Sequence, residues 1–267
     1  MEWEKKLTLL NCIISDLQII HSKNISHRDL HSGNILLNNL HIAYIADLGL
    51  SVLADLGSKN EIYGVMPYLA PEVLYSKEYS MASDIYSFGI IAYEIVSGVL
   101  AFHDIPHDIN LARKIHRGLR PSIPTRVPRL VADLIIKCWN ADPDQRPSSK
   151  NIVDTLEVWN NEILNNEITE FISQIQEADR ITYGNITSHF ETHPEAFYVS
   201  RQIHSLNTTD FNKQSNHLDN REDNREDNRE DSRSLLIIDL AQVSLDDIVE
   251  NEKKGVILSG IHGNKAC

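Results

Sequence analysis

The spacing of hydrophobic residues predicts a series of helices over the first 160 positions. Between Leu7 and His21, apolar side chains recur every three or four residues, which places them on one face of an α-helix. The same spacing predicts further helices at residues 107–117, 128–139 and 149–159. Residues 83–98 are apolar nearly all round, so this helix should lie buried in the middle of the fold.

Two short extended segments interrupt these helices. Residues 35–37 form an apolar run directly after a polar loop, and residues 40–46 have the character of a strand that follows an Asn38-Asn39 turn. We expect the two segments to form a short β pair beside that loop. The sequence therefore predicts a mainly α fold with little sheet.

The hydrophobic pattern changes twice after position 160. Five apolar residues first continue the helical spacing, namely Ile163, Ile168, Phe171, Ile175 and Ala178. They predict an amphipathic helical extension, residues 161–180, that packs on the rest of the chain or on a partner. From 181 to 267 we expect a largely disordered tail, because the Arg-Glu-Asp-Asn repeat at residues 221–231 is too short and too polar to bury a core.

Composition and charge narrow the possible partners and the compartment. The 267 residues are 42% hydrophobic and carry a formal net charge of −13, which argues against nucleic acid or an anionic membrane as the main partner. Neither a signal peptide nor an apolar run of membrane-spanning length is apparent. The odd number of widely separated cysteines favours reduced thiols. We therefore expect a cytoplasmic protein.

The chemistry of the sequence is concentrated in the polar loop at residues 27–34, which reads HRDLHSGN. It carries one carboxylate, Asp29, and one amide, Asn34, at a fixed offset in a loop between two buried segments. A second carboxylate, Asp47, follows the predicted strand at residues 40–46. With a strand pair between them, Asp29 and Asp47 can face one site.

This loop resembles the catalytic loop H-R-D-L-x-x-x-N of eukaryotic protein kinases, and every specified position is filled. Asp47-Leu48-Gly49 is similar to the kinase D-F-G motif, with Leu48 in place of Phe. The resemblance implies ATP and Mg²⁺ as cofactors. It assigns catalytic roles to Asp29, Asn34 and Asp47, metal binding to Asn34 and Asp47, and ATP binding to Asn34, Leu36 and Asp47.

Three further landmarks occur in kinase order. Residues 70–72 match the A-P-E motif, Asp84 begins the central apolar helix, and a Trp, an Asp-Pro turn and Arg146-Pro precede the last helix. The resemblance implies that Arg146 pairs with Glu72 and that Asp84 binds the backbone of the catalytic loop. It also gives His27 and Arg28 structural or regulatory roles. Asp84 could also be an ordinary helix N-cap.

The resemblance covers about residues 7–159, so we interpret residues 1–160 as the C-terminal lobe of a protein kinase. A complete kinase also has a glycine-rich loop, a strand lysine and a helix glutamate upstream of the catalytic loop. The 26 residues before His27 predict only one helix. We therefore expect the N-terminal β lobe to be absent and this chain, as given, to have weak or no activity alone.

The sequence leaves the substrate hydroxyl open. His31, Gly33 and Val65 match neither the serine/threonine nor the tyrosine pattern, although the loop is most similar to tyrosine-kinase-like serine/threonine kinases. His31 is either a solvated loop residue or a weak phosphate contact. Arg28 could pair with a phosphorylated activation segment, for which three hydroxyls are candidates. These candidates are Ser51, Ser58 and Tyr63.

Three functions remain in competition. The first is a protein kinase that acts on protein serine, threonine or tyrosine hydroxyls. The second is a non-catalytic kinase-like module that binds proteins through its peptide groove. The third, a small-molecule phosphotransferase, lacks the A-P-E motif and the Arg-Pro turn that this chain carries. Either of the first two requires a protein substrate or partner, and the oligomeric state is left open.

Overall fold

The computed structural model describes residues 1–39, 42–53, 62–165, 167–182 and 191–203. The helices of this part of the chain are α1 (Trp3–Ser22), α2 (Pro71–Ser76), α3 (Met81–Ser97), α4 (Ile109–His116), α5 (Arg129–Cys138), α6 (Ser149–Leu164) and α7 (Glu170–Thr182). Its strands are β1 (Ile25–Ser26), β2 (Ile35–Asn39), β3 (Ile42–Ile45), β4 (Val52–Leu53), β5 (Ile62–Gly64) and β6 (Arg201–Ile203). Three single turns of 3-10 helix are η1 (Ser32–Asn34), η2 (Met66–Tyr68) and η3 (Pro143–Gln145). The predicted mainly α fold is confirmed.

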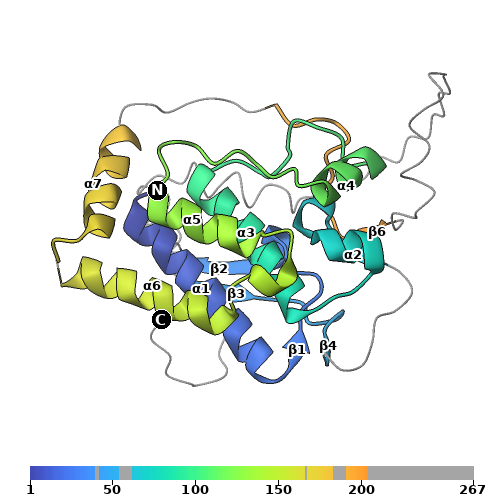
Figure 1. Ribbon diagram of the computed structural model, residues 1–267, viewed down its shortest axis with the longest axis horizontal. Coiled ribbons are helices and arrows are strands. Elements are labelled where there is room, and N and C mark those ends of the chain that lie inside the picture. The colour runs from blue at the N-terminus through green and yellow to red at the C-terminus, as the bar shows by residue number, and fades with distance from the viewer. Residues whose placement is uncertain (40–41, 54–61, 166, 183–190, 204–267) are drawn as a thin grey trace, which may run out of the picture.

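The buried helix α3 runs through the middle of the lobe and packs against α1 and α5 (Figure 1). Its start is a capping box, in which the Ser80 hydroxyl accepts from the Ser83 amide at 3.2 Å and the Ser83 hydroxyl accepts from the Ser80 amide at 3.0 Å. Gly98 ends the helix at φ +73°. The possible N-cap role of Asp84 is therefore corrected, because Ser80 holds that position and Asp84 is free to bind elsewhere.

Helix α1 packs along α6 on one side and against β3 on another. Its apolar stripe is fully buried, with Leu7, Ile14 and Leu17 all at 0% exposure. The helix begins four residues before the predicted stripe, because Trp3 is also buried and the Lys6 ammonium donates to the Val96 carbonyl at 2.9 Å. These contacts hold α1 against the end of α3.

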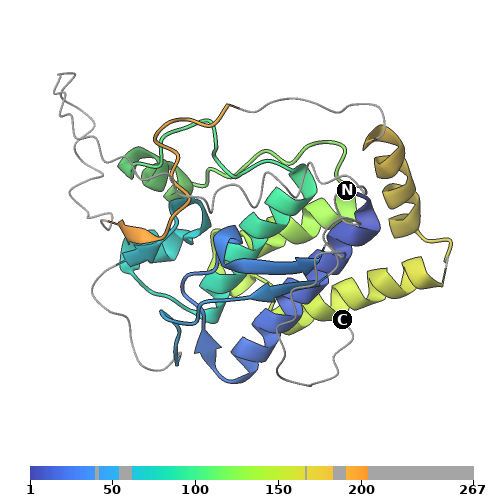
Figure 2. The same ribbon diagram turned by 180° about the vertical axis from the view of Figure 1, so that it is seen from behind.

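The strands of the described residues form three antiparallel pairs. The pair β2–β3 is the one that the sequence predicted, and it lies over α1 and α3 in Figure 2. The pair β1–β4 joins the start of the catalytic loop to the segment after Asp47. The pair β5–β6 was not predicted, and it joins segments almost 140 residues apart in the sequence.

Helix α7 packs back on the lobe rather than on a separate partner. Phe171 stacks on Trp159 of α6, with ring centroids 4.7 Å apart and planes at 11°. Phe171, Ile175 and Ala178 are buried, as their helical spacing predicts. Ile168 is fully exposed and precedes the helix, so the extension begins later than expected, after α6 has continued to Leu164.

The prediction of a disordered tail is corrected for residues 191–203, which lie across the lobe and end in β6. Figures 1 and 2 both place β6 beside α2. The segment has no helical periodicity, and backbone hydrogen bonds to distant loops hold it in place. The repeat at residues 221–231 lies outside the described residues.

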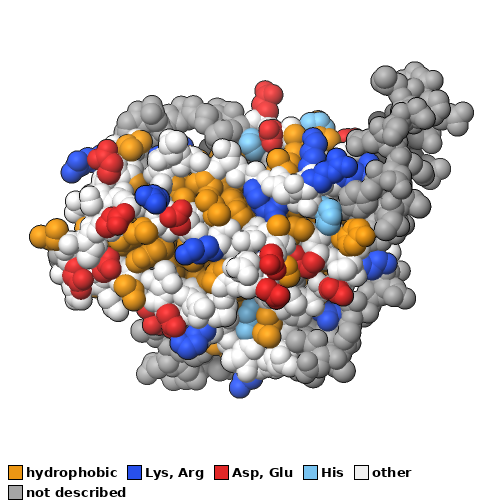
Figure 3. Space-filling view, viewed as in Figure 1, with side chains coloured by type: hydrophobic (Ala, Val, Ile, Leu, Met, Phe, Trp, Pro, Cys, Tyr) orange, Lys and Arg blue, Asp and Glu red, His pale blue; other side chains and the backbone are white. Residues whose placement is uncertain are grey.

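In the part of the chain that the structure describes, no helix is long and apolar enough to cross a membrane. Cys12 and Cys138 are buried and form no disulfide in the described part of the chain, and burial raises the pKa of Cys138 to about 12. Despite the acidic net charge, Lys and Arg side chains gather around α4 on the face in Figure 3, where Arg113 and Lys114 lie in the last turn of that helix.

Candidate active site

The catalytic loop is fixed from beneath by one buried carboxylate. Asp84 Oδ2 accepts from the His27 amide at 2.8 Å and from His21 Nε2 at 3.0 Å, and Asp84 Oδ1 accepts from the Arg28 amide at 3.0 Å. Asp84 is 1% exposed. Hydrogen bonds to a buried carboxylate are stronger than neutral ones, so the buried helix α3 sets the position of this loop.

The loop contains a strained backbone turn at Arg28, whose φ is +71°. A left-handed conformation costs a residue with a side chain about 1–2 kcal/mol, and the bond from the Arg28 amide to Asp84 offsets that cost. The guanidinium lies 5.6 Å from the centre of the Tyr79 ring and donates to the Ser26 hydroxyl at 3.4 Å. The turn directs the following residue, Asp29, toward the site.

Asp29 is 8% exposed, and its Oδ1 has no hydrogen-bond partner within the described part of the protein. The other oxygen, Oδ2, lies 3.8 Å from His31 Nε2. Gly64, at φ +143°, lies close to this oxygen, since a Cβ there would stand 3.4 Å from Asp29 Oδ1 and 2.9 Å from Leu69 Cδ2. A buried acceptor without a donor is the arrangement expected of a group that takes up a substrate proton.

Backbone bonds bring Asn34 and Asp47 to the same end of the β2–β3 pair. The Ala46 amide, next to Asp47, donates to the Asn34 carbonyl at 2.8 Å, and His27 Nε2 bonds the Ala46 carbonyl at 3.2 Å. Asn34 Nδ2 donates to the Asp29 carbonyl at 2.8 Å. Asp47 itself is left-handed at φ +58°, a conformation that Asp tolerates. These bonds hold Asp29, Asn34 and the residue before Asp47 in one connected part of the backbone.

The oxygens at this site fit magnesium bound together with phosphates better than a closed metal cage. Asn34 uses its amide nitrogen to bond the Asp29 carbonyl, which leaves its side-chain oxygen as a potential ligand, as the Asp47 carboxylate also is. No group of three or more His, Cys, Asp or Glu side chains that could hold a metal occurs in the described ranges. Magnesium characteristically binds one or two carboxylates and completes its shell with water and substrate phosphates.

His31 is buried at 7% exposure, so it is not a solvated loop residue. Its Nδ1 accepts from the Gly33 amide at 3.1 Å, which assigns the ring proton to Nε2, the nitrogen that faces Asp29. Burial lowers the pKa of His31, against the opposing attraction of Asp29. The ring is therefore neutral near pH 7.

Sequence reasoning missed a buried chain of polar groups beneath the loop. The Ser32 hydroxyl lies 2.6 Å from the Tyr68 hydroxyl, which in turn donates to both carboxyl oxygens of Glu94 at 2.8 Å. The Ala101 amide also donates to Glu94, at 3.0 Å. Burial raises the pKa of Glu94 to about 7. The sequence did contain a sign of this buried polar chain, since Glu94 is a single acidic residue within an apolar helical run.

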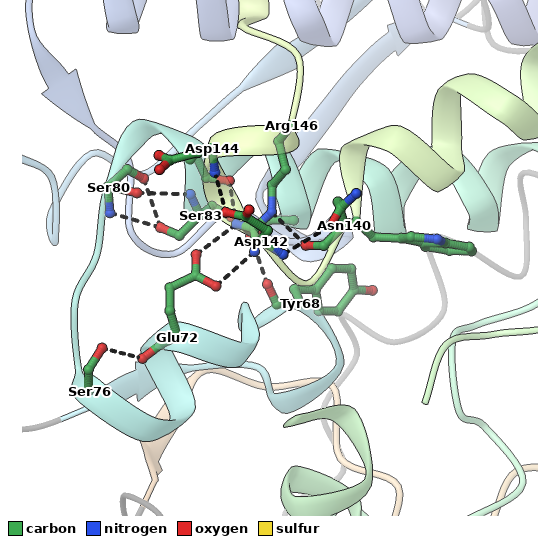
Figure 4. Close-up of polar contacts among 12 residues, drawn as sticks. Tyr68, Glu72, Ser76, Ser80, Ser83, Asn140, Asp142, Asp144 and Arg146 are labelled. Carbon is green, nitrogen blue, oxygen red and sulfur yellow. Dashed lines mark hydrogen bonds and ion pairs between the residues drawn. The ribbon is translucent and has the colours of Figure 1, made fainter. Parts of the chain in front are cut away.

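The predicted pair of Arg146 and Glu72 is present and bidentate (Figure 4). Arg146 Nη1 and Nη2 donate to Oε1 and Oε2 of Glu72 at 2.6 and 2.8 Å. Arg146 also donates to the carbonyls of Ala82 and Asn140, so its fully buried guanidinium ties α2 to the start of α3 and to the loop before α6.

The three candidate phosphorylation sites fall in different places. The Ser51 hydroxyl donates to the His27 carbonyl at 3.3 Å, so it already contacts the catalytic loop. Tyr63 lies in β5, where its amide and carbonyl both bond the Tyr79 hydroxyl. Ser58 lies outside the described residues.

The fold and these contacts define a protein-kinase-like lobe, with its catalytic loop, metal-binding motif and buried Arg–Glu pair in their expected relation. The family described as protein tyrosine and serine/threonine kinase matches residues 1–156, which is more than half of the chain. The chain therefore belongs to that family.

Individual relatives match over the same region. The chain is 31% identical over 146 residues to serine/threonine-protein kinase STY46 of Arabidopsis thaliana, covering 54% of this chain and 25% of the relative. It is 33% identical over 155 residues to serine/threonine/tyrosine-protein kinase HT1 of the same plant, covering 58% and 40%. It is also 34% identical over 149 residues to platelet-derived growth factor receptor alpha of Takifugu rubripes, covering 54% and 14%. The chain thus spans well under half the length of each of these relatives.

Proposed function

We propose that this chain supplies the catalytic half of a protein kinase and takes part in signal transduction in the cytoplasm. The reaction is transfer of the γ-phosphoryl group of ATP to a serine, threonine or tyrosine hydroxyl of a protein. The observation that carries the proposal is the set of hydrogen bonds that holds Asp29, Asn34 and the residue before Asp47 in one connected part of the backbone.

Each residue has a distinct role in this proposal. The substrate hydroxyl oxygen bonds the γ-phosphorus, the bond to the bridging oxygen of ADP breaks, and Asp29 receives the hydroxyl proton. Asn34 and Asp47 would hold Mg²⁺, which neutralises charge on the phosphates when bound. Leu36, which is 55% exposed on β2, offers an apolar surface to the adenine ring.

The exposure of this nucleotide surface leads us to expect weak or no kinase activity from the chain alone. Leu36 and Leu48 are both more than half exposed, so the nucleotide would meet protein on one side only within the described residues. Pocket-bound ligands normally bury most of their surface. This exposure favours the second candidate, a kinase-like module that binds a protein without turnover.

Titration calorimetry with MgATP separates the two candidates. We expect weak binding that is lost in Asp47→Ala and retained in Asp154→Ala, a matched control on the exposed face of α6. Absence of any binding that depends on Asp47 would refute the nucleotide site and favour the binding module. A phosphorylation assay on a mixed pool of Ser, Thr and Tyr peptides should detect little turnover, and Asp29→Asn should remove it. Robust turnover by the chain alone would contradict the one-sided nucleotide site.

Ser51 and Tyr63 are proposed regulatory sites, because Arg28 lies in the adjoining loop and a phosphate could pair with its guanidinium. Intact-mass analysis after co-expression with an active kinase, with Ser51→Ala and Tyr63→Phe as controls, tests each site separately.

A further inference from the structure

The segment at residues 191–203 ends in a strand beside the candidate catalytic carboxylate. Strand β6 pairs antiparallel with β5, with Arg201 opposite Gly64 and Ile203 opposite Ile62. Gly64 lies next to the candidate catalytic carboxylate, with Asp29 Oδ1 3.4 Å from the position that a Cβ would take. Only one strand, β5, therefore separates β6 from the site of proton transfer.

The two edges of β5 are occupied differently. The Tyr79 hydroxyl accepts from the Tyr63 amide at 3.1 Å and donates to the Tyr63 carbonyl at 2.7 Å, so Tyr63 directs its backbone polar groups away from β6. Because paired residues alternate along an antiparallel ladder, the bonds between the strands belong to the pairs Ile62–Ile203 and Gly64–Arg201. The edge of β5 that faces β6 is thus one that an added strand completes, and β6 occupies it in this structure.

Polar contacts anchor the residues before β6 to the loop between α3 and α4. The His193 amide donates to the His103 carbonyl at 2.7 Å, and the His107 amide donates to the Glu195 carbonyl at 2.9 Å. The Tyr198 hydroxyl donates to the Ala101 carbonyl at 2.9 Å.

One aromatic side chain, Tyr198, and one cationic side chain, Arg201, also hold the segment in place. The Tyr198 ring packs edge-on against His107, with centroids 4.8 Å apart, and Arg201 donates to the His107 carbonyl at 2.7 Å. His107 is 3% exposed and Ile203 is 7% exposed, so the segment buries side chains as well as bonding the backbone. A specific docked conformation, rather than a loose surface contact, follows from these bonds.

We propose that residues 191–203 are an intramolecular ligand of the β5 edge, and that a protein substrate or partner reaches this edge only after β6 leaves it. This proposal rests on the proposed function, because it assumes that a protein substrate of the kinase site binds along β5. A tethered segment acts at an effective concentration of about 1 mM. It therefore excludes free peptides that bind the same edge with comparable affinity.

A binding experiment on the full chain tests the docking without requiring catalysis. A fluorescently labelled synthetic peptide of residues 191–203 is titrated with the wild-type chain, Ile203→Pro and Gln202→Pro, and its anisotropy is followed. Ile203→Pro removes an amide from the ladder, whereas Gln202→Pro is the matched control at a position whose amide points away from β5. We expect the peptide to bind Ile203→Pro at least about tenfold more tightly than it binds the wild type or Gln202→Pro.

Equal affinity for all three proteins, or no binding to a folded Ile203→Pro, would overturn the proposal. Circular dichroism establishes whether Ile203→Pro is folded. If it is not, the double variant Tyr198→Phe/Arg201→Ala, which loses two side-chain anchors and keeps the backbone, should show the same gain in peptide affinity.

A parallel assay of phosphoryl transfer to a peptide distinguishes this proposal from the proposed function. If the chain phosphorylates the peptide, Ile203→Pro should lower the KM for the peptide and leave kcat unchanged. If no protein shows turnover and the anisotropy difference holds, the docking stands and the kinase function fails. If turnover occurs and the anisotropy difference is absent, the kinase function stands and the docking fails.

Discussion

Replacement of Asp84 by Asn should release the catalytic loop from the buried helix α3 with little change in side-chain volume. Asp84 accepts three hydrogen bonds, from the His27 and Arg28 amides and from His21 Nε2. An Asn would keep its oxygen toward His27 and His21, where two donors meet, and would turn its amide nitrogen toward the Arg28 amide. Two buried donors would then face each other.

The expected loss of folding stability in Asp84→Asn follows from these hydrogen bonds. A buried amide without an acceptor costs about 1–3 kcal/mol, and the two remaining bonds lose the strength that the charge gave them. We expect the free energy of unfolding to fall by about 2–4 kcal/mol. The strained Arg28 turn, at φ +71°, would lose the bond that holds it, so the loop should open before the rest of the lobe unfolds.

Urea unfolding measures the loss of global stability, and hydrogen exchange measures the local opening of the catalytic loop. Asp154→Asn is the matched control, since its carboxylate is exposed and pairs with the exposed Lys150 one turn away. In Asp84→Asn, the amides of His27 and Arg28 should exchange faster than those at the middle of α3. If both variants unfold within about 0.5 kcal/mol of each other, Asp84 does not hold the loop and the reasoning is wrong.

Two other predictions concern buried charges. Because burial raises the pKa of Glu94 from 4.5 to about 7, folding favours the protonated acid, and stability should fall by about 3 kcal/mol as the pH rises through this range. Glu94→Gln should remove that pH dependence in urea unfolding, and an unchanged slope would contradict the assignment. Glu72→Gln leaves the Arg146 guanidinium buried without its carboxylate, so thermal and urea unfolding should show a loss of about 3–5 kcal/mol. A loss as small as that of Asp154→Asn would show that the Arg146–Glu72 pair does not stabilise the lobe.

Local sequence patterns were enough to predict all the described helices except the short α2, and to single out the residues of the candidate site. The periodicity that predicts α1, α3 and α6 is a property of neighbouring residues, and the burial of those faces bears it out. The match at residues 27–34 similarly placed Asp29 and Asn34 on one loop because their spacing is short. The pair of Arg146 and Glu72 could be predicted only through the family resemblance, since 73 residues lie between its members.

The features that the sequence did not reveal depend on partners far away along the chain. Glu94 reads as one acidic residue in an apolar helix until Tyr68 and Ser32 are placed against it. The unpredicted pairing of β5 with β6 likewise joins segments that are far apart in the sequence.

The sequence by itself determined the succession of helices, the kinase motifs and the residue types of the catalytic loop, because each of these is written in short spacings. The tertiary structure alone decided that α7 folds back on Trp159 and that residues 191–203 complete the edge of β5. The sequence could not reveal the strand pairing because the edge of a strand can hydrogen-bond to almost any extended backbone segment. Its amides and carbonyls are the same in every sequence, so the pairing leaves no distinctive side-chain pattern to recognise.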